Sequence, residues 1–117
     1  MHENIPMEKE KATIEVLQQQ LENESGLIIY FYSDKCAPCI SLRPKISQMV
    51  EDNFPEMKLT FINSENHPEV TGNFGVFANP TLIVFFEGKE FRRYSKYISI
   101  NELGGDIERV YNMVFSE

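Results

Sequence analysis

Residues 27–39 read LIIYFYSDKCAPC and carry the strongest structural signal in the chain. The run from Leu27 to Tyr32 is six consecutive apolar, β-prone residues, a pattern typical of a strand buried on both faces of a sheet. Residues 33–35 are polar and leave the strand, and Cys36 and Cys39 follow directly. The sequence therefore predicts a buried strand that ends beside a pair of cysteines.

Helical patterns lie on both sides of this segment. Residues 8–24 carry one apolar stripe at helical spacing, and a second amphipathic helix follows Cys39, with Pro44 as a kink inside it. Further along, the pattern predicts strands over 58–63, 81–86 and 89–96, a weak helix over 65–74, and a final helix capped by Ser99 or Asn101. The turn at Glu87-Gly88 makes 89–96 an antiparallel edge strand. We expect an α/β protein with a mixed sheet, organised as a flexible tail over 1–7 and one domain over 8–117.

Composition and charge narrow the classes of function. The chain has 117 residues with 11 basic and 18 acidic side chains, a net charge of −7, which opposes the binding of nucleic acid. The apolar runs are far shorter than the ~20 residues that span a bilayer, so no membrane association is expected. The first residues lack the basic-then-apolar pattern of a secretory signal, so we expect a cytoplasmic protein.

The cysteine count is equally restrictive. Two cysteines three positions apart cannot staple a small disulfide-rich fold, because a bridge across so short a loop hardly restricts the unfolded chain. A closed zinc site within one chain would need four ligands and would have to recruit both His2 and His67. We therefore expect no metal.

The placement of the cysteines predicts their chemistry. Cys36 falls at the start of a helix, where free backbone N–H groups and the helix dipole stabilise a thiolate. Lys35 adds a positive charge, Pro38 fits the first helical turn, and Ala37 completes it. Cys39 lies one turn further in and is more buried. In this interpretation Cys36 attacks a disulfide and Cys39 resolves the mixed disulfide, so the only redox group is the cysteine pair itself.

Four segments together resemble the thioredoxin family over residues 8–115. They are residues 27–39 with the CAPC motif, Pro44 five residues after Cys39, the run FGVFANPT at 74–81, and the hairpin FFEGK at 85–89. The resemblance implies the thioredoxin fold, a central mixed sheet of four or five strands flanked by about four helices. It also implies a monomeric thiol–disulfide oxidoreductase that reduces disulfide-containing proteins and receives electrons from a donor of the thioredoxin reductase type.

The resemblance also assigns substrate-binding roles. It implies that Pro80 is cis and lies beside the cysteines, and that Asn79 pairs its backbone with the substrate chain. Phe77 or Phe74 is expected to be an apolar contact for substrate, with Phe74 the better candidate for the core. Tyr30 falls where the family has the buried carboxylate that moves the proton of the second cysteine. A phenol with a reference pKa near ~10 is a poor base for that role.

Other departures from the family keep alternative functions open. Lys35 stands where the family has tryptophan, and Lys96 or Tyr97 falls where it has a glycine. The missing tryptophan and the missing buried carboxylate support a second hypothesis, a thioredoxin-like module that binds a protein partner or senses redox state with little turnover. A third hypothesis is a metal or iron–sulfur site shared across a dimer.

Overall fold

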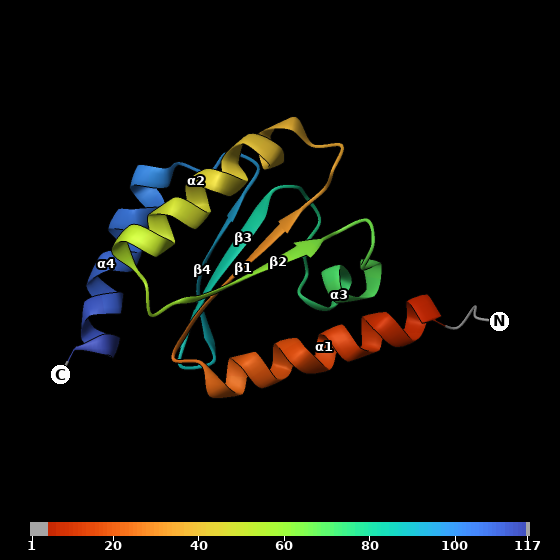
Figure 1. Cartoon of the computed structure of the whole chain (residues 1–117), viewed down its shortest axis with the longest axis horizontal. Coiled ribbons are helices and arrows are strands. Elements are labelled where there is room, and N and C mark those ends of the chain that lie inside the picture. Colours follow the sequence, from red (N-terminus) through yellow and green to blue (C-terminus); the bar gives the residue numbers. More distant parts are fainter. Residues whose placement is uncertain (1–4, 117) are drawn as a thin grey trace.

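The computed structural model describes residues 5–116, with side chains from residue 13 onward. Helices and strands alternate along most of this part of the chain (Figure 1). In chain order they are α1 (Ile5–Asn23), β1 (Gly26–Tyr32), α2 (Ala37–Asn53), β2 (Lys58–Asn63), α3 (Pro68–Asn73), β3 (Thr81–Phe86), β4 (Lys89–Ser95) and α4 (Ile100–Phe115).

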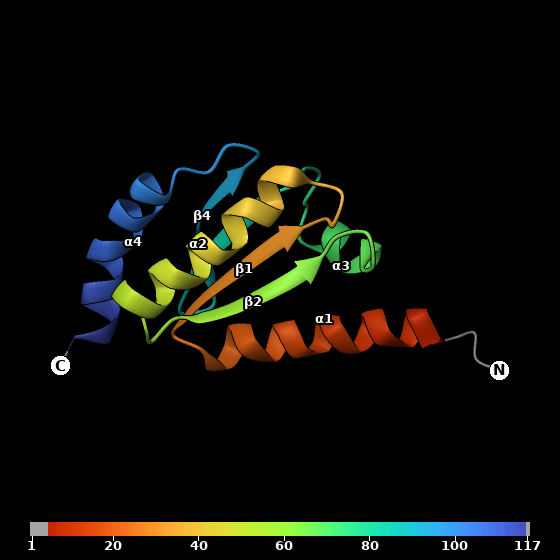
Figure 2. The same cartoon turned by 45° about the horizontal axis from the view of Figure 1, so that its top comes forward.

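The strands form a single four-stranded sheet in the order β2-β1-β3-β4. β2 runs parallel to β1, whereas β3 is antiparallel to both β1 and β4. A parallel pair needs a crossover connection, and α2 supplies it. Helices α2 and α4 cover one face of the sheet, and α1 and α3 cover the other (Figure 2). The predicted mixed sheet with four helices is therefore confirmed, with four strands among the residues described.

The central strand β1 separates two apolar cores. Its residues Leu27 to Phe31 are all buried, and successive side chains point to opposite faces. Ile28 and Tyr30 belong to the core beneath α2 and α4, whereas Leu27, Ile29 and Phe31 belong to the core beneath α1 and α3. Every second residue of β1 therefore faces the helix that follows the cysteines.

The ends of several elements differ from the sequence prediction. Helix α1 begins at Ile5, so residues 5–7 of the predicted tail are helical, while residues 1–4 lie outside the described residues. The first residues of this helix show no apolar periodicity, so the sequence did not indicate the early start. Proline at position 6 is compatible with a first helical turn. Ser99 rather than Asn101 caps α4, because its hydroxyl accepts a hydrogen bond from the Glu102 N–H at 3.2 Å. None of the helices within residues 5–116 has the length and apolar character of a membrane span.

Two turns that flank β4 use left-handed backbone. In the β3–β4 hairpin, Glu87 and Gly88 have φ of 53° and 78°, as a two-residue turn with matching twist requires. A Cβ at Gly88 would lie 2.9 Å from the Leu21 carbonyl oxygen, so the end of α1 also requires glycine there. After β4, Lys96 has φ of 67° and donates its N–H to the Pro80 carbonyl at 2.8 Å.

The backbone at Lys96 leads to a stability prediction. We expect Lys96→Gly to raise the free energy of unfolding by about 0.5 kcal/mol, because the left-handed strain that it relieves exceeds the entropy that glycine adds to the unfolded chain. Urea unfolding of the oxidised protein measures this difference. Lys89→Gly is the matched control. Because Lys89 lies in a strand, this substitution should lower the free energy of unfolding by about 0.5 kcal/mol. A Lys96→Gly protein less stable than the parent would contradict the prediction.

Candidate functional site

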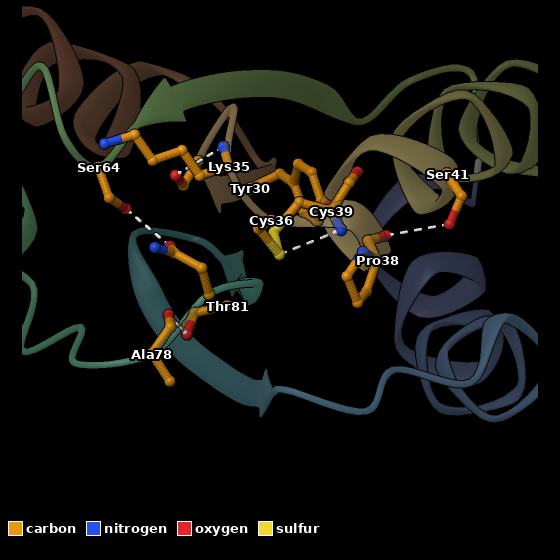
Figure 3. Close-up of a disulfide and its surroundings, with 11 residues drawn as sticks. Tyr30, Lys35, Cys36, Pro38, Cys39, Ser41, Ser64, Ala78 and Thr81 are labelled. Carbon is orange, nitrogen blue, oxygen red and sulfur yellow. Dashed lines mark hydrogen bonds between the residues drawn. A yellow bond between two sulfur atoms is a disulfide. The ribbon is translucent and has the colours of Figure 1, made fainter.

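The two cysteines lie between the end of β1 and the first turn of α2 and are joined by a disulfide, with Cα atoms 5.2 Å apart. Cys36 is the N-cap of α2, and its Sγ accepts a hydrogen bond from the Cys39 backbone N–H at 3.2 Å (Figure 3). Cys36 is half-buried, whereas Cys39 is fully buried. An incoming sulfur atom therefore reaches Cys36 before Cys39.

A tight turn presents Cys36 to the helix start. The Cys36 N–H donates to the Ser33 carbonyl at 3.1 Å, and the Lys35 N–H donates to the Ser33 hydroxyl at 3.1 Å. Pro38 lies in the first turn of α2, where its missing N–H removes no helical bond. Ala37, Pro38 and Lys35 are exposed. A negative charge on the Cys36 sulfur would thus meet a helix N-terminus and a neighbouring lysine.

The loop before β3 lies on the other side of the disulfide. The peptide bond between Asn79 and Pro80 is cis, and Pro80 is buried. The Thr81 hydroxyl donates to the Ala78 carbonyl at 2.7 Å, and the Ser64 hydroxyl donates to Asn79 Oδ1 at 2.9 Å (Figure 3). The first bond closes the loop on itself, and the second ties the loop to the segment that follows β2.

The two phenylalanines of this region have different environments. Phe77 is 92% exposed, so it lies free on the surface beside the loop. Phe74 packs against the core beneath α1 and α3, with its ring 5.9 Å from Phe31 and 6.2 Å from Phe85. Of the two, Phe77 is thus the one that is free to contact another molecule.

A groove of about 400 Å³ lies beside the disulfide, between α2, the cis-proline loop and the segment that joins β4 to α4. We call it the proline groove, and its lining residues are Pro38, Ser41, Leu42, Lys45, Pro80, Lys96, Tyr97, Ile98 and Ser99. A second hollow of about 510 Å³ lies between α2 and α4. Neither hollow is lined by a cysteine, but the proline groove is lined by Pro38, which lies between the two cysteines in the sequence, so this groove borders the disulfide segment.

Tyr30 is buried directly beneath the first turns of α2. Its hydroxyl donates to the Cys39 carbonyl at 2.9 Å. Burial raises the pKa of Tyr30 to about 12, and the positive charge of Arg43 lowers it in part. Arg43 itself stacks on Tyr32 and Phe61, with centroid distances of 4.7 and 4.4 Å. At neutral pH the phenol thus keeps its proton and acts as a hydrogen-bond donor rather than as a base.

Several residues around the site did not emerge from the sequence. One of them is Ser64, whose hydroxyl bonds Asn79. A signal for its position existed, because Ser64 follows β2 and the carboxyl ends of the parallel strands β1 and β2 share an edge of the sheet. Lys45 and Ile98 line the proline groove without any sequence signal, because their positions depend on how loops meet. Among the described residues, no three histidine, cysteine, aspartate or glutamate side chains gather as a metal site.

The amino-acid sequence of this chain is similar to those of known proteins. A family model described as Thioredoxin matches residues 8–109. The thioredoxin-like protein YdfQ of Bacillus subtilis is 35% identical over 89 residues, which is 76% of this chain and 79% of that protein. A thioredoxin of Alicyclobacillus acidocaldarius is 26% identical over 80 residues, 68% of this chain and 76% of its own.

Solved structures agree on the fold. Thioredoxin O2 of Arabidopsis thaliana in its oxidised state superposes with a TM-score of 0.76 at 20% identity, covering 87% of this chain and 89% of its own. Thioredoxin 1 of Thermosipho africanus superposes with a TM-score of 0.68 at 29% identity, covering 74% and 96%. A family match over most of the chain coincides with a cysteine pair at a helix start, so the chain belongs to the thioredoxin family and is a thiol–disulfide oxidoreductase.

Proposed function

We propose that this chain is a protein disulfide reductase in which Cys36 is the attacking nucleophile and Cys39 the resolving thiol. The difference between the two sulfurs supports this assignment most directly. Cys36 is half-buried and accepts the Cys39 N–H at the helix start, whereas Cys39 is fully buried. A backbone donor and a helix dipole favour thiolate at Cys36, and burial in apolar surroundings disfavours it at Cys39.

The reaction proceeds in two exchanges. The Cys36 thiolate attacks one sulfur of a substrate disulfide, so that a new sulfur–sulfur bond forms and the other substrate sulfur leaves as thiolate. Cys39, once deprotonated, attacks the Cys36 sulfur and expels the second substrate thiolate. The substrate gains two electrons, and this chain loses two as the Cys36–Cys39 disulfide forms. Because Tyr30 is protonated at neutral pH, we assign proton removal from Cys39 to water rather than to the phenol.

The substrate and the donor follow from this role. The substrates are disulfide-containing proteins, with the Asn79 backbone and Phe77 as contacts beside Pro80. A donor of the thioredoxin reductase type returns the two electrons, and the protein acts as a monomer. A reductant is useful where thiols are kept reduced, so we propose that it works in the cytoplasm.

The reduction potential of the Cys36/Cys39 couple tests the direction of electron flow. The Ala-Pro pair between the cysteines is close to the Gly-Pro of reducing relatives, so we expect a value near ~−270 mV rather than ~−120 mV. Equilibration with glutathione buffers, followed by thiol alkylation, measures it. A value close to that of the strong oxidants would overturn the reductase proposal while leaving thiol–disulfide exchange intact.

A second candidate, a binding or redox-sensing module, is favoured by the neutral Tyr30 at the place of the family's carboxylate. The rate of Cys36 alkylation as a function of pH distinguishes the two. A Cys36 pKa near or below ~7 supports the reductase, whereas a value near ~8.5 supports the module.

A further inference from the structure

The lining of the proline groove combines an apolar floor with positive charge. Pro38, Leu42, Pro80 and Ile98 supply the apolar surface, and Lys45 and Lys96 add two ammonium groups. Within the part of the chain that the structure describes, no aspartate or glutamate lines the groove, although the chain carries 18 acidic residues and a net charge of −7. The groove is thus a local positive site on an acidic protein.

Both lysines are available to a partner. Each is exposed, and among the described residues neither forms an ion pair with a carboxylate. Other cations of the chain do form ion pairs or ring contacts, as Arg93 does with Glu90 at 2.8 Å and Arg43 does with Tyr32 and Phe61. Among the described side chains, the charges at the groove therefore have no ion-pair partner.

The backbone fixes the position of one of these charges. Lys96 adopts φ of 67°, and its N–H donates to the Pro80 carbonyl at 2.8 Å. Position 96 is thereby held beside the cis-proline loop. Lys45 lies on α2, so the two lysines that line the groove come from different segments of the chain.

We propose that the proline groove binds an extended substrate segment that carries an aspartate or glutamate within about three residues of its reactive half-cystine, a span of about 10 Å in an extended chain. Lys45 and Lys96 recognise the carboxylate, and the apolar floor and Tyr97, which is 93% exposed, contact the flanking side chains. This inference rests on the proposed reductase function and names its substrate class.

The test compares two disulfide-linked peptides that differ only by glutamate or glutamine two residues from the half-cystine. The wild-type chain should reduce the glutamate peptide with kcat/KM about 5- to 10-fold higher at low salt, because two partly exposed pairs each contribute modestly. In Lys45→Glu/Lys96→Glu this ratio should fall to about 1 or below. In 0.5 M NaCl the wild-type ratio should also shrink, since the Debye length there is only a few ångströms (about 3 to 5 Å).

A matched control separates the groove from net charge. Lys58→Glu/Lys89→Glu makes the same change in net charge at two exposed lysines outside the groove and should keep the wild-type ratio. Equal rates for the two peptides in the wild-type chain, or loss of the ratio in this control, would overturn the proposal.

Binding of serine-substituted peptides, which cannot be reduced, separates the specificity of the groove from the reductase function. Tighter binding of the glutamate form of the serine peptide, with no turnover of either disulfide-linked peptide, would overturn the reductase function and support the groove. Turnover of both peptides with no difference in binding would overturn the groove and support the reductase.

Discussion

Replacing Cys36 with serine is expected to lower the rate of insulin disulfide reduction by at least about 1,000-fold. A serine hydroxyl at this position is not ionised at neutral pH and cannot form the mixed disulfide. The Cys36 sulfur is the accessible one of the pair, since Cys39 is fully buried, so no other thiol of the chain replaces it.

Cys39→Ser is the informative partner of this variant. It retains the attacking thiol and loses the resolving one, so it should accumulate a covalent adduct with substrate that dithiothreitol releases. Non-reducing electrophoresis detects the adduct, and it should be absent from Cys36→Ser. If Cys36→Ser reduces insulin at the parent rate, the assignment of attacker and resolver is wrong.

The second large effect concerns Tyr30 and alkaline stability. Because the folded pKa of Tyr30 is raised to about 12, the protonated phenol stabilises the folded state, fully below pH ~10 and progressively less as the pH rises towards 12. One pKa unit corresponds to ~1.4 kcal/mol, so on the order of 3 kcal/mol of folding free energy depends on this proton. Tyr30→Phe removes that dependence, together with the hydrogen bond to the Cys39 carbonyl.

We therefore expect the stability difference between the two proteins to change sign. At pH 8, Tyr30→Phe should be less stable by about 1 kcal/mol, the usual value of a lost hydrogen bond. Between pH 10 and 12 the curves should cross, because only the parent chain loses the Tyr30 contribution. Urea unfolding at a series of pH values measures this.

Tyr94→Phe is the control for this experiment. Burial and a hydrogen bond to Asp106 also raise the pKa of Tyr94. The stability that depends on the Tyr94 proton is therefore lost at alkaline pH in the parent and in Tyr30→Phe alike. A stability difference between Tyr30→Phe and the parent that is independent of pH would contradict the assignment of the raised pKa to Tyr30.

The sequence predicted the strands whose burial or exposure is marked by a run of apolar or charged residues. The continuous apolar runs of β1 and β3 indicated central strands, and they pair with each other in the middle of the sheet. The charged β4 was expected at an edge and lies there. The start of α1 at Ile5 was missed, because the first residues of that helix carry no apolar stripe.

The site was predictable only where a motif marks it. The cysteine pair and the Asn79-Pro80 loop stand out as residue patterns, and the structure places both at one end of the sheet. Lys45 and Tyr97 share the proline groove although 52 positions separate them in the sequence, and no local periodicity predicts such a meeting. The hydrogen bond between Ser64 and Asn79 likewise joins two loops.

The alternation along β1 has a consequence for how this protein can diverge from its relatives. Leu27, Ile29 and Phe31 face away from α2, so a change of volume there is met by α1 and α3 before it reaches the cysteines. Ile28 and Tyr30 have no such buffer, because they pack in the core beneath α2. Substitutions on one side of this strand are therefore expected to change stability alone, whereas substitutions on the other side also shift the helix that carries the cysteines.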